Sequence, residues 1–250
     1  MDKKYCIAVV GCGRIAANAH FPAFKALGNV RVKYACDIIE RKAAEKKSEY
    51  DFVENAITDY KIALADPEVE AVYVLTPNYA HYVVAMDALK AGKHVFCEKP
   101  LAETVEKCKK AEKIVEAHPE LIFMLGFMRR YDHSYAIAKE KINRGDIGDI
   151  VLVRCYSQDP IAIIKGTLEY APRSGGQFID MSIHDIDLIR WLTESEPKKL
   201  WAIGGCYEFK QYKDWDDGDN VSCLIQNENE TMAFFYAGRA AAHGSAVETE

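Results

Sequence analysis

The stretch YCIAVVGCGRIA, residues 5–16, decides the fold of the first half of the chain. Its apolar run predicts a buried strand, and a helical pattern begins directly after the glycines. GCGRIA fits the G-x-G-x-x-G/A turn, in which Gly11 permits a tight bend and Gly13 lets the backbone approach a pyrophosphate. Ala16 is small enough for the helix to pack on the strand, and the free N–H groups of the helix start favour phosphates. The strand–turn–helix context strengthens a motif that is weak alone.

An acidic residue follows the glycine turn at the spacing that is typical of dinucleotide-binding domains. Asp37 ends the second apolar run, at the position from which an acid accepts hydrogen bonds from the adenosine ribose. Its charge repels a 2′-phosphate and favours NAD over NADP, although the nearby Arg41 softens that preference. The alternative is a glycine turn with a surface aspartate.

The first half alternates strand-like and helix-like segments, which predicts βαβ units around a parallel sheet. The strand-like runs are almost wholly apolar, as expected of strands covered on both faces. The predicted strands are Tyr5–Val10, Val30–Cys36, Ala71–Leu75, His94–Cys97 and Leu121–Leu125. The predicted helices are Arg14–Leu27, with a break or kink at Pro22, Glu40–Glu49, Asp59–Ala65, Tyr79–Ala91 and Val105–His118.

The pattern changes after Gly126, where we place a hinge. We expect a dinucleotide-binding domain over residues 1–126 and an α+β domain over residues 127–250, with a mostly antiparallel, mixed sheet. The expected elements are helices at Ser134–Asn143 and Phe178–Leu192, a loop at Asp159–Gly176, and strands at Val151–Tyr156, Lys199–Phe209, Asn220–Gln226 and Thr231–Tyr236.

A lysine follows the strand that ends at Cys97, in the sequence Cys97-Glu98-Lys99-Pro100. Ligands of open α/β sheets bind at the carboxyl ends of strands, and Thr76-Pro77-Asn78, with His81 one turn on, reaches the same edge. Lys99 is therefore placed to hydrogen-bond a substrate hydroxyl and stabilise developing negative charge. The alternative is a solvated lysine.

A third motif, DMSIH, lies on the apolar helix predicted over 178–192. Asp180 and His184 stand four residues apart and should share one helix face. Burying a carboxylate and an imidazole is costly unless they pair or face a cavity, so the two fit an oriented base. A buried structural Asp–His pair is the alternative.

Together these motifs resemble the Gfo/Idh/MocA oxidoreductase family, over essentially the whole chain. The resemblance rests on GCGRIA, TPNYAH, CEKPLAET, GFMRRYDHSY from Gly126, SGGQFIDMSIHDIDLIRWL from Ser174 and FFYAGRAA from Phe234. GFMRRYD and the SGG-to-IHD segment are most similar to its myo-inositol 2-dehydrogenase branch. The resemblance implies a Rossmann domain joined to a mixed-sheet domain, with NAD, or NADP, bound in the cleft between them.

What the resemblance implies is an enzyme that moves a hydride between nicotinamide and a secondary alcohol of a cyclitol or sugar. Lys99, Asp180 and His184 match the family's catalytic set: His184 as base, Lys99 on the substrate oxygen, Asp180 orienting them. Arg129, Asp187 and Tyr236 would line the substrate site. The predicted cofactor-binding residues are Gly11, Gly13, Arg14, Ile15, Asp37, Arg41, Thr76, Pro77, Asn78, His81, Glu98 and Lys99.

Composition excludes several other classes. Lys and Arg number 32 against 38 Asp and Glu, a net charge of −6 without a basic block, so we expect no nucleic-acid partner. Cys6–Val10, the longest apolar run near the start, is too short for a signal peptide or a membrane span, which favours the cytoplasm. The eight cysteines fit reduced, buried thiols, and the seven scattered histidines predict no metal.

Members of the family usually continue beyond the length of this chain, so we expect an incomplete second domain with unpaired sheet edges. The resemblance also implies a homo-oligomer, a dimer or tetramer, through the exposed face of the second sheet. Two other functions stay open: a different sugar or diol dehydrogenase of the family, and a non-catalytic dinucleotide-binding sensor. The sensor has no chemical need for Lys99, Asp180 and His184 together.

Overall fold

The computed structural model describes residues 4–242, 244 and 246–250. Contacts along the chain divide it into two compact units, residues 1–126 and 127–250. Each unit has its own sheet and its own apolar core, and each is described separately below.

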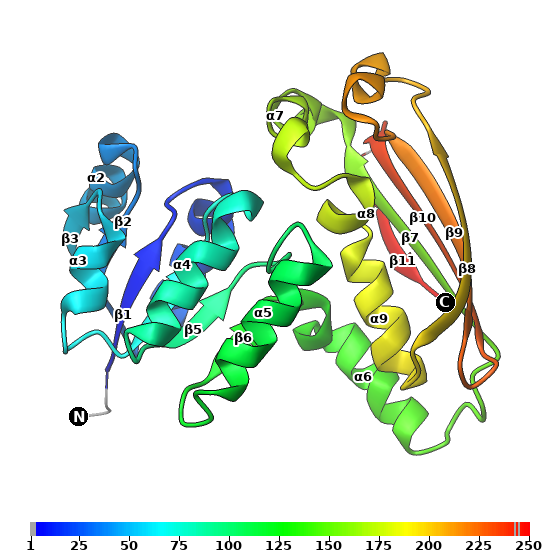
Figure 1. The fold of residues 1–250 in the computed structure, drawn as a ribbon, viewed down its shortest axis with the longest axis horizontal. Coiled ribbons are helices and arrows are strands. Elements are labelled where there is room, and N and C mark those ends of the chain that lie inside the picture. Colours follow the sequence, from blue (N-terminus) through cyan, green and yellow to red (C-terminus); the bar gives the residue numbers. More distant parts are fainter. Residues whose placement is uncertain (1–3, 243, 245) are drawn as a thin grey trace. The chain divides into compact units, whose positions relative to one another are not determined.

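The sheet of the first unit is wholly parallel in the described residues, as expected of a doubly wound fold (Figure 1). Its strand order is β3-β2-β1-β4-β5-β6. The strands are β1 (Tyr5–Val10), β2 (Val30–Cys36), β3 (Val53–Ile57), β4 (Ala71–Val74), β5 (His94–Cys97) and β6 (Phe123–Leu125). The order reverses between β1 and β4, and open α/β sheets bind ligands at such a switch point.

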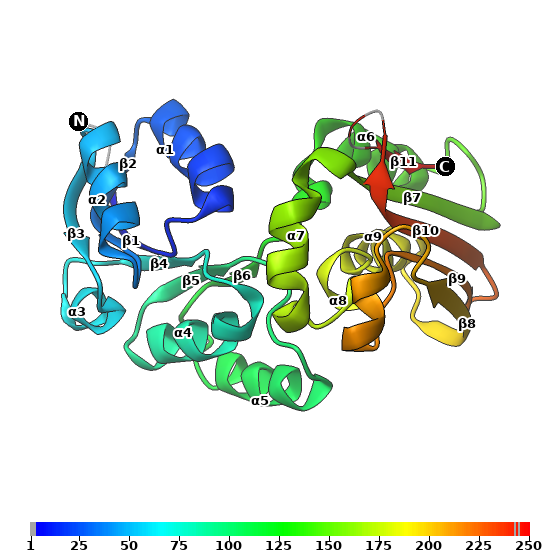
Figure 2. The ribbon, with the colours of Figure 1, turned by 90° about the horizontal axis from the view of Figure 1, so that it is seen from above.

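Helices cover both faces of this sheet (Figure 2). They are the π-helical turn η1 (Ala16–His20), α1 (Phe21–Leu27), α2 (Glu40–Glu49), α3 (Tyr60–Ala65), α4 (Asn78–Lys90) and α5 (Val105–Glu116). Strand β1 supplies both cores, because alternate side chains point to opposite faces. Ala8 and Val10 pack with α3, α4 and α5, whereas Ile7 and Val9 pack with η1, α1 and α2.

Two details of the first unit differ from the sequence prediction. Strand β3 was not predicted, because its sequence VENAI mixes polar and apolar residues at a sheet edge. The helix expected over 14–27 forms without the expected break: the chain stays helical throughout, and only its winding changes, from π-helical in η1 to α-helical in α1. Pro22 lies just after the π-helical turn, and a proline, which has no N–H to donate to the preceding turn, commonly accompanies such a local change in a helix.

The second unit contains a mixed sheet with the order β11-β7-β10-β9-β8. The strands are β7 (Leu152–Pro160), β8 (Pro197–Gly205), β9 (Asn220–Asn227), β10 (Met232–Ala241) and β11 (Ala246–Thr249). Only β7 and β10 pair in parallel among the described strands of this unit; the other pairs are antiparallel. The predicted architecture of a parallel sheet followed by a mixed sheet is therefore confirmed.

Helices α6 (His133–Asn143), α8 (Gln177–Asp180) and α9 (Ile183–Thr193) pack on one face of the second sheet. The other helical segments of this unit are η2 (Met128–Tyr131), η3 (Ile161–Ile163), α7 (Ile164–Tyr170), η4 (Ala171–Arg173) and η5 (Lys210–Trp215). Helix α9 runs along the sheet in Figure 1, and its Ile189 and Leu192 pack against Val153 and Phe235. The opposite face keeps large apolar side chains exposed, such as Trp201 at 62% and Leu224 at 52%.

The prediction of one helix over 178–192 is wrong. Helix α8 ends at Asp180, a turn follows at Met181 and Ser182, and α9 begins at Ile183. Asp180 and His184 therefore lie on two different helices rather than on one face of a single helix. Ser182 followed three residues later by Asp185 is a common helix-start pattern, although the Ser182 hydroxyl makes no capping bond.

The loop expected over 159–176 is also only partly correct. It contains helix α7 and the short turns η3 and η4, which flank α7. Pro160 and Pro172, which suggested a loop, stand at the starts of η3 and η4. Proline is well tolerated at the start of a helix, so the two prolines mark boundaries rather than an absence of structure.

Candidate functional site

The glycine turn after β1 requires glycine at its first position. Gly11 has a φ of 101°, and a Cβ built there would lie 2.4 Å from the carbonyl oxygen of Leu75. The end of β4 thus approaches the turn too closely for any side chain. At Gly13 a Cβ would meet nothing within 4 Å, so the backbone faces open space on that side. Arg14 and Ile15, which follow, are exposed.

Asp37 is anchored beside this turn at the end of β2. Its Oδ2 accepts a hydrogen bond from the backbone N of Cys12 at 2.9 Å, and its Oδ1 accepts one from that of Ile39 at 2.9 Å. Each carboxylate oxygen has a second lone pair, so the group can still accept bonds from ribose hydroxyls. Arg41 pairs with Glu45 at 2.6 Å on the exposed side of α2, which offsets the positive charge nearest to Asp37 in sequence.

Burial, together with a smaller contribution from the Asp37 charge, raises the pKa of the Cys12 thiol within the turn to about 12. Burial likewise raises the pKa of Cys36 at the end of β2 to about 12. Both thiols are therefore neutral at physiological pH, and the turn carries no thiolate charge that would repel a phosphate.

The chain after β4 offers one orphaned polar atom. The hydroxyl oxygen of Thr76 is buried and has no hydrogen-bond partner in the described part of the chain. Pro77 is exposed, and Asn78, at the start of α4, is buried. An unsatisfied buried hydroxyl is costly, and here it lies at the sheet edge where a nucleotide would supply a partner.

His81 joins the segments that follow β4 and β5. It is 1% exposed, its Nδ1 lies 2.7 Å from the carbonyl oxygen of Pro100, and its Nε2 lies 2.6 Å from that of Thr76. Burial lowers the pKa of His81, while the two carbonyl contacts oppose that shift. His81 thus connects the segment after β4 with the segment after β5 through both of its ring nitrogens.

Glu98 meets a residue that sequence reasoning missed. Its Oε1 lies 2.8 Å from Nε2 of His20, the last residue of η1. The His20 ring also packs edge-on to Phe96, with ring centroids 5.2 Å apart. Lys99 follows directly, is partly exposed, and is joined to Pro100 by a cis peptide bond. The segment that carries Lys99 is therefore held against η1 by the His20–Glu98 pair.

In the second unit, Asp180 is held on both oxygens. Its Oδ2 accepts a hydrogen bond from Nη2 of Arg239 at 2.6 Å, and its Oδ1 accepts one from the hydroxyl of Tyr170 at 3.1 Å. Arg239 was also missed. Phe235, Ala237 and Arg239 alternate along β10, and the first two are buried against the helices, so an inward-facing arginine was the available signal.

His184 is the second residue of α9 and is partly exposed. Its ring stands edge-on to Phe127, with centroids 6.4 Å apart. An aromatic neighbour on one side limits the orientations open to an imidazole. Asp180, at the end of α8, and His184, near the start of α9, thus flank the turn at Met181 and Ser182.

Arg129 and Asp187, predicted to contact substrate, are engaged in separate ion pairs. Arg129 donates to Asp185 at 2.5 Å and to the hydroxyl of Ser157 at 2.8 Å, and the Asp185 side chain is wholly buried. Burial raises the pKa of Asp185, and Arg129 opposes that rise. Arg130 donates two hydrogen bonds, of 2.8 and 2.6 Å, to the carboxylate of Asp187.

Tyr236, the third predicted substrate residue, alternates with the inward-facing Phe235 and Ala237 and so points to the other face of the sheet. There its hydroxyl donates to Oδ1 of Asn220 at 2.5 Å. The structure does not bring Tyr236 to the face that carries Asp180. The substrate roles of Arg129, Asp187 and Tyr236 stay predictions.

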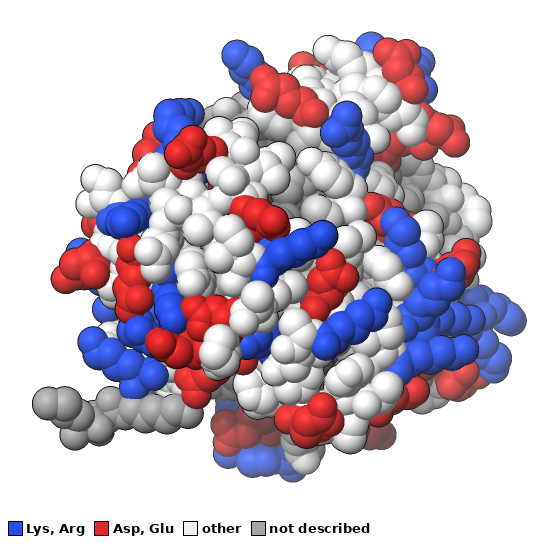
Figure 3. Space-filling model, turned by 60° about the vertical axis from the view of Figure 1, so that its left-hand side comes forward, with Lys and Arg blue, Asp and Glu red and all other residues white. Residues whose placement is uncertain are grey.

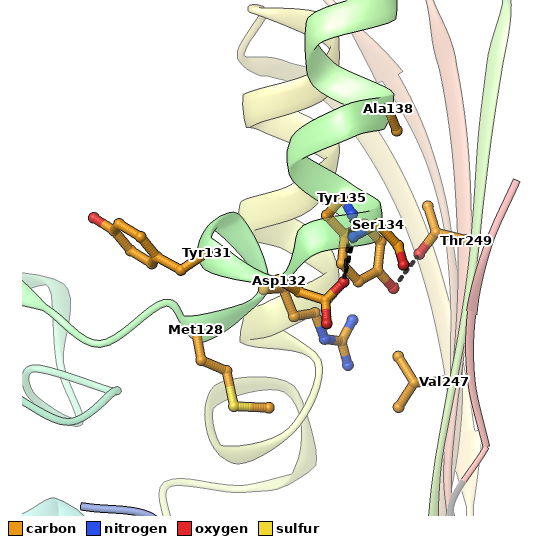
Figure 4. A pocket seen from close by; sticks show the side chains of 9 residues that line it. Met128, Tyr131, Asp132, Ser134, Tyr135, Ala138, Val247 and Thr249 are labelled. Carbon is orange, nitrogen blue, oxygen red and sulfur yellow. Dashed lines mark hydrogen bonds between the residues drawn. The ribbon is translucent and has the colours of Figure 1, made fainter. Parts of the chain in front are cut away.

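A hollow of about 660 Å³ lies beside the start of α6 (Figure 4). In Figure 4 the hydroxyl groups of Tyr135 and Thr249 meet at 3.1 Å, and Asp132 caps α6 through the backbone N of Ser134. The lining residues are Met128, Arg129, Tyr131, Asp132, Ser134, Tyr135, Ala138, Val247 and Thr249. Neither Asp180 nor His184 is among them, so we do not assign this hollow to the candidate site.

The molecular surface mixes both charges. Lys and Arg side chains lie among Asp and Glu side chains over much of the face in Figure 3, with one gathering of basic side chains toward its right-hand edge. Among the described residues, no group of three His, Cys, Asp or Glu side chains is arranged to hold a metal ion. The described helices include none with the length and apolar character that a membrane crossing requires.

Comparison with known proteins gives matches over both units. The family described as "Oxidoreductase family, NAD-binding Rossmann fold" matches residues 6–127, and the "GFO/IDH/MocA C-terminal domain" matches residues 135–250. The myo-inositol 2-dehydrogenase of Thermotoga maritima is 30% identical over 245 residues, which are 95% of this chain and 70% of that protein. The scyllo-inositol 2-dehydrogenase (NAD(+)) of Bacillus subtilis is 29% identical over 251 residues, 100% of this chain and 72% of that protein.

A solved structure is similar over nearly the same span. The scyllo-inositol dehydrogenase of Lactobacillus casei, with bound NAD(H) and scyllo-inositol, superposes with a TM-score of 0.91 at 37% sequence identity. The alignment covers 99% of this chain and 73% of that one.

Proposed function

This chain belongs to the GFO/IDH/MocA oxidoreductase family, as its motifs predicted, and we propose that it is an NAD-dependent dehydrogenase of a cyclitol or a related sugar. The observation that carries the proposal is its similarity, over nearly its whole length, to inositol dehydrogenases, one of them with NAD(H) and scyllo-inositol bound. Another polyol or sugar as the substrate is the alternative within the same reaction class.

The residues of the first unit fit a nicotinamide dinucleotide. Gly11 and Gly13 form a turn with one open side, Thr76 presents an unsatisfied buried hydroxyl, and Asp37 presents an anchored carboxylate. The Asp37 carboxylate disfavours a 2′-phosphate. Arg41, which could attract such a phosphate, forms an ion pair with Glu45, so we propose NAD rather than NADP. When bound, the nicotinamide accepts or donates the hydride.

We propose Lys99, Asp180 and His184 as the catalytic residues. His184 accepts the proton of the substrate hydroxyl, because an imidazole is an effective base near neutral pH. Lys99 donates a hydrogen bond to the same oxygen and stabilises the negative charge that develops there. Asp180 orients the proton acceptor, for which it must stay ionised, and its hydrogen bonds from Arg239 and Tyr170 support that state.

The proposal is tested by measuring NADH formation, through its near-ultraviolet absorbance, with a panel of substrates that includes myo-inositol, scyllo-inositol and several sugars. We expect K99A and H184A to lose turnover while NADH binding, measured by fluorescence, persists. The exposed Lys113 of α5 provides a matched control, and K113A should behave as the wild type. NADH binding without turnover of any substrate would favour the dinucleotide sensor instead.

We also propose that the chain forms a homo-oligomer through the face of the second sheet that the helices leave open. Trp201, Leu224 and Met232 are 62%, 52% and 48% exposed on that face, and adjacent large apolar side chains commonly mark protein interfaces. Light scattering after size exclusion should give more than one chain per particle, and L224K should lower that number. A monomeric wild type refutes this part.

For the compartment we propose the cytoplasm. The eight cysteines are all free in the described structure, and six of them are buried. Thiols that are not paired in disulfides suit a reducing compartment. Fractionation of cells that express a tagged copy tests this, and recovery of the tagged chain outside the cytoplasm contradicts it.

A further inference from the structure

One arginine of the second unit binds three acceptors at once. Arg239 on β10 is 5% exposed, and each nitrogen of its guanidinium donates one hydrogen bond. Nε donates to Oε1 of Gln177 at 2.7 Å, Nη1 to Oδ2 of Asp159 at 2.7 Å, and Nη2 to Oδ2 of Asp180 at 2.6 Å. The arginine therefore connects strand β10 with the end of β7 and with both ends of α8.

The charge of this cluster depends on Arg239. Two carboxylates, those of Asp159 and Asp180, share a single positive charge. Burial alone would lower the pKa of Arg239, but the charges and hydrogen bonds of the two aspartates raise it above its usual value. Arg239 thus stays protonated at every physiological pH. Without it, two nearby carboxylates would remain in a largely buried place, and at least one would tend to take up a proton.

Helix α8 cannot fix Asp180 by itself. It has four residues, and helices this short are not stable without tertiary contacts. It begins after Gly175 and Gly176, both with positive φ, and its first backbone N donates to the carboxylate of Asp217. The position of Asp180 at the other end of α8 is set by its bonds to Arg239 and Tyr170.

We propose that Arg239 is a positioning residue of the catalytic site: it holds Asp180 ionised and correctly oriented for proton transfer. This inference rests on the proposed function of Asp180. Lysine is no substitute, because a single ammonium cannot reproduce the planar, three-directional donor set of a guanidinium. Arg239 acts through Asp180, so its loss should change the rate of turnover rather than the binding of NADH, which belongs to the first unit.

A double-mutant cycle tests this with R239M, R239K, D180N and the double variant R239M/D180N. We expect R239M to lower kcat about 100-fold, as for misplacement of a catalytic group, with KM and NADH affinity changed far less. The kcat of the double variant should be no lower than that of the slower single variant, because both changes act on one group, the Asp180 carboxylate. R239K keeps the buried positive charge and should fold, yet it should also lower kcat.

Arg190 provides the matched control. It grips Glu196 through two hydrogen bonds on the exposed side of α9, away from Asp180, so R190M should keep the wild-type kcat. The proposal is overturned if the fold-losses of kcat in R239M and D180N multiply in the double variant. It is also overturned if R239K has the wild-type kcat. Thermal unfolding of each variant separates a lost fold from a lost position.

A second measurement does not depend on the substrate. Within residues 127–250, the titratable groups around the Arg239–Asp180 pair include Asp159, Tyr170 and Tyr212, with Asp217 and Asp219 near Tyr212. In the wild type, the carboxyl carbon of Asp180, observed by NMR, should titrate at a lower pH than in R239M, which removes the positive charge beside it. An unchanged titration overturns the role of Arg239 even if no substrate is found. A wild type that binds NADH but turns over nothing, with the expected titration, refutes the proposed function alone.

Discussion

Replacing Gly11 with alanine should damage the first unit more than any other glycine substitution described above. The new Cβ would lie 2.4 Å from the carbonyl oxygen of Leu75, 2.5 Å from its carbonyl carbon and 2.7 Å from the backbone N of Thr76. These are backbone atoms and cannot rotate away. Leu75 is also tied to β1 by the hydrogen bond from its N to the carbonyl oxygen of Val10, at 2.7 Å. The ends of β1 and β4 would have to separate.

Two costs combine in G11A. A positive φ costs an L-residue about 1–2 kcal/mol, and forcing extra volume into a packed place costs about 1–3 kcal/mol more. The sum, about 2–5 kcal/mol, is a large part of the 5–15 kcal/mol that stabilises a typical domain. Urea unfolding followed by circular dichroism should show it as a lower midpoint. NADH affinity should also fall, since the turn moves with the strands.

Alanine substitutions at Gly28 and Gly13 distinguish the cost of a positive φ from the cost of contact with the backbone. Gly28 has a φ of 68° and nothing within 4 Å of a built Cβ, so G28A should lose only about 1–2 kcal/mol. Gly13 has open space too, so G13A should fold normally but bind NADH more weakly if the pyrophosphate lies against it. Equal stability of G11A and G28A would refute the argument from backbone contact, and wild-type NADH affinity in G13A would refute the placement of the pyrophosphate.

Three further predictions concern charged groups. D37S should shift the ratio of NADH to NADPH affinity toward NADPH by about tenfold, measured by fluorescence titration, because a repulsive charge is lost; an unchanged ratio contradicts the role of Asp37. R129M should cost about 3–5 kcal/mol in urea unfolding, because it leaves Asp185 buried and unpaired, whereas R129M/D185L should recover most of the loss; equal instability of both variants contradicts this. The hydrogen bond from Lys33 lowers the pKa of Asp66 from 3.8 to about 2, so its stabilisation is complete above pH 3.8 and disappears as the pH falls toward 2. The unfolding midpoints of the wild type and D66N should therefore converge in acid, and a constant difference between them contradicts the assignment.

The first unit was largely predictable because its determinants are local. Runs such as Tyr5–Val10 and Val30–Cys36 are continuous and apolar, and a glycine turn directly follows the first. Strand β3 was not predicted because Glu54 and Asn55 interrupt its apolar character at a sheet edge. There, pairing with β2 rather than the sequence itself makes the segment a strand.

The second unit was less predictable because its site is assembled from distant segments. The acceptors of Arg239 lie at positions 159, 177 and 180, and no local pattern states that one arginine will meet all three. Asp180 and His184 were singled out because they are polar residues in an apolar stretch, and their catalytic roles stay predictions. Their expected common helix face was wrong, since periodicity continues across the turn that separates α8 from α9.

The pairing of β7 has a consequence for the order in which the second unit is made. Its two neighbours in the sheet, β10 and β11, begin at Met232 and Ala246, whereas β7 begins at Leu152. During synthesis β7 therefore emerges from the ribosome long before either neighbour exists. Its apolar side chains Val153 and Cys155 then have no sheet to join, and an unpaired strand readily associates with other chains. The second unit is thus the part of the nascent protein in which an apolar strand waits longest for its sheet partners.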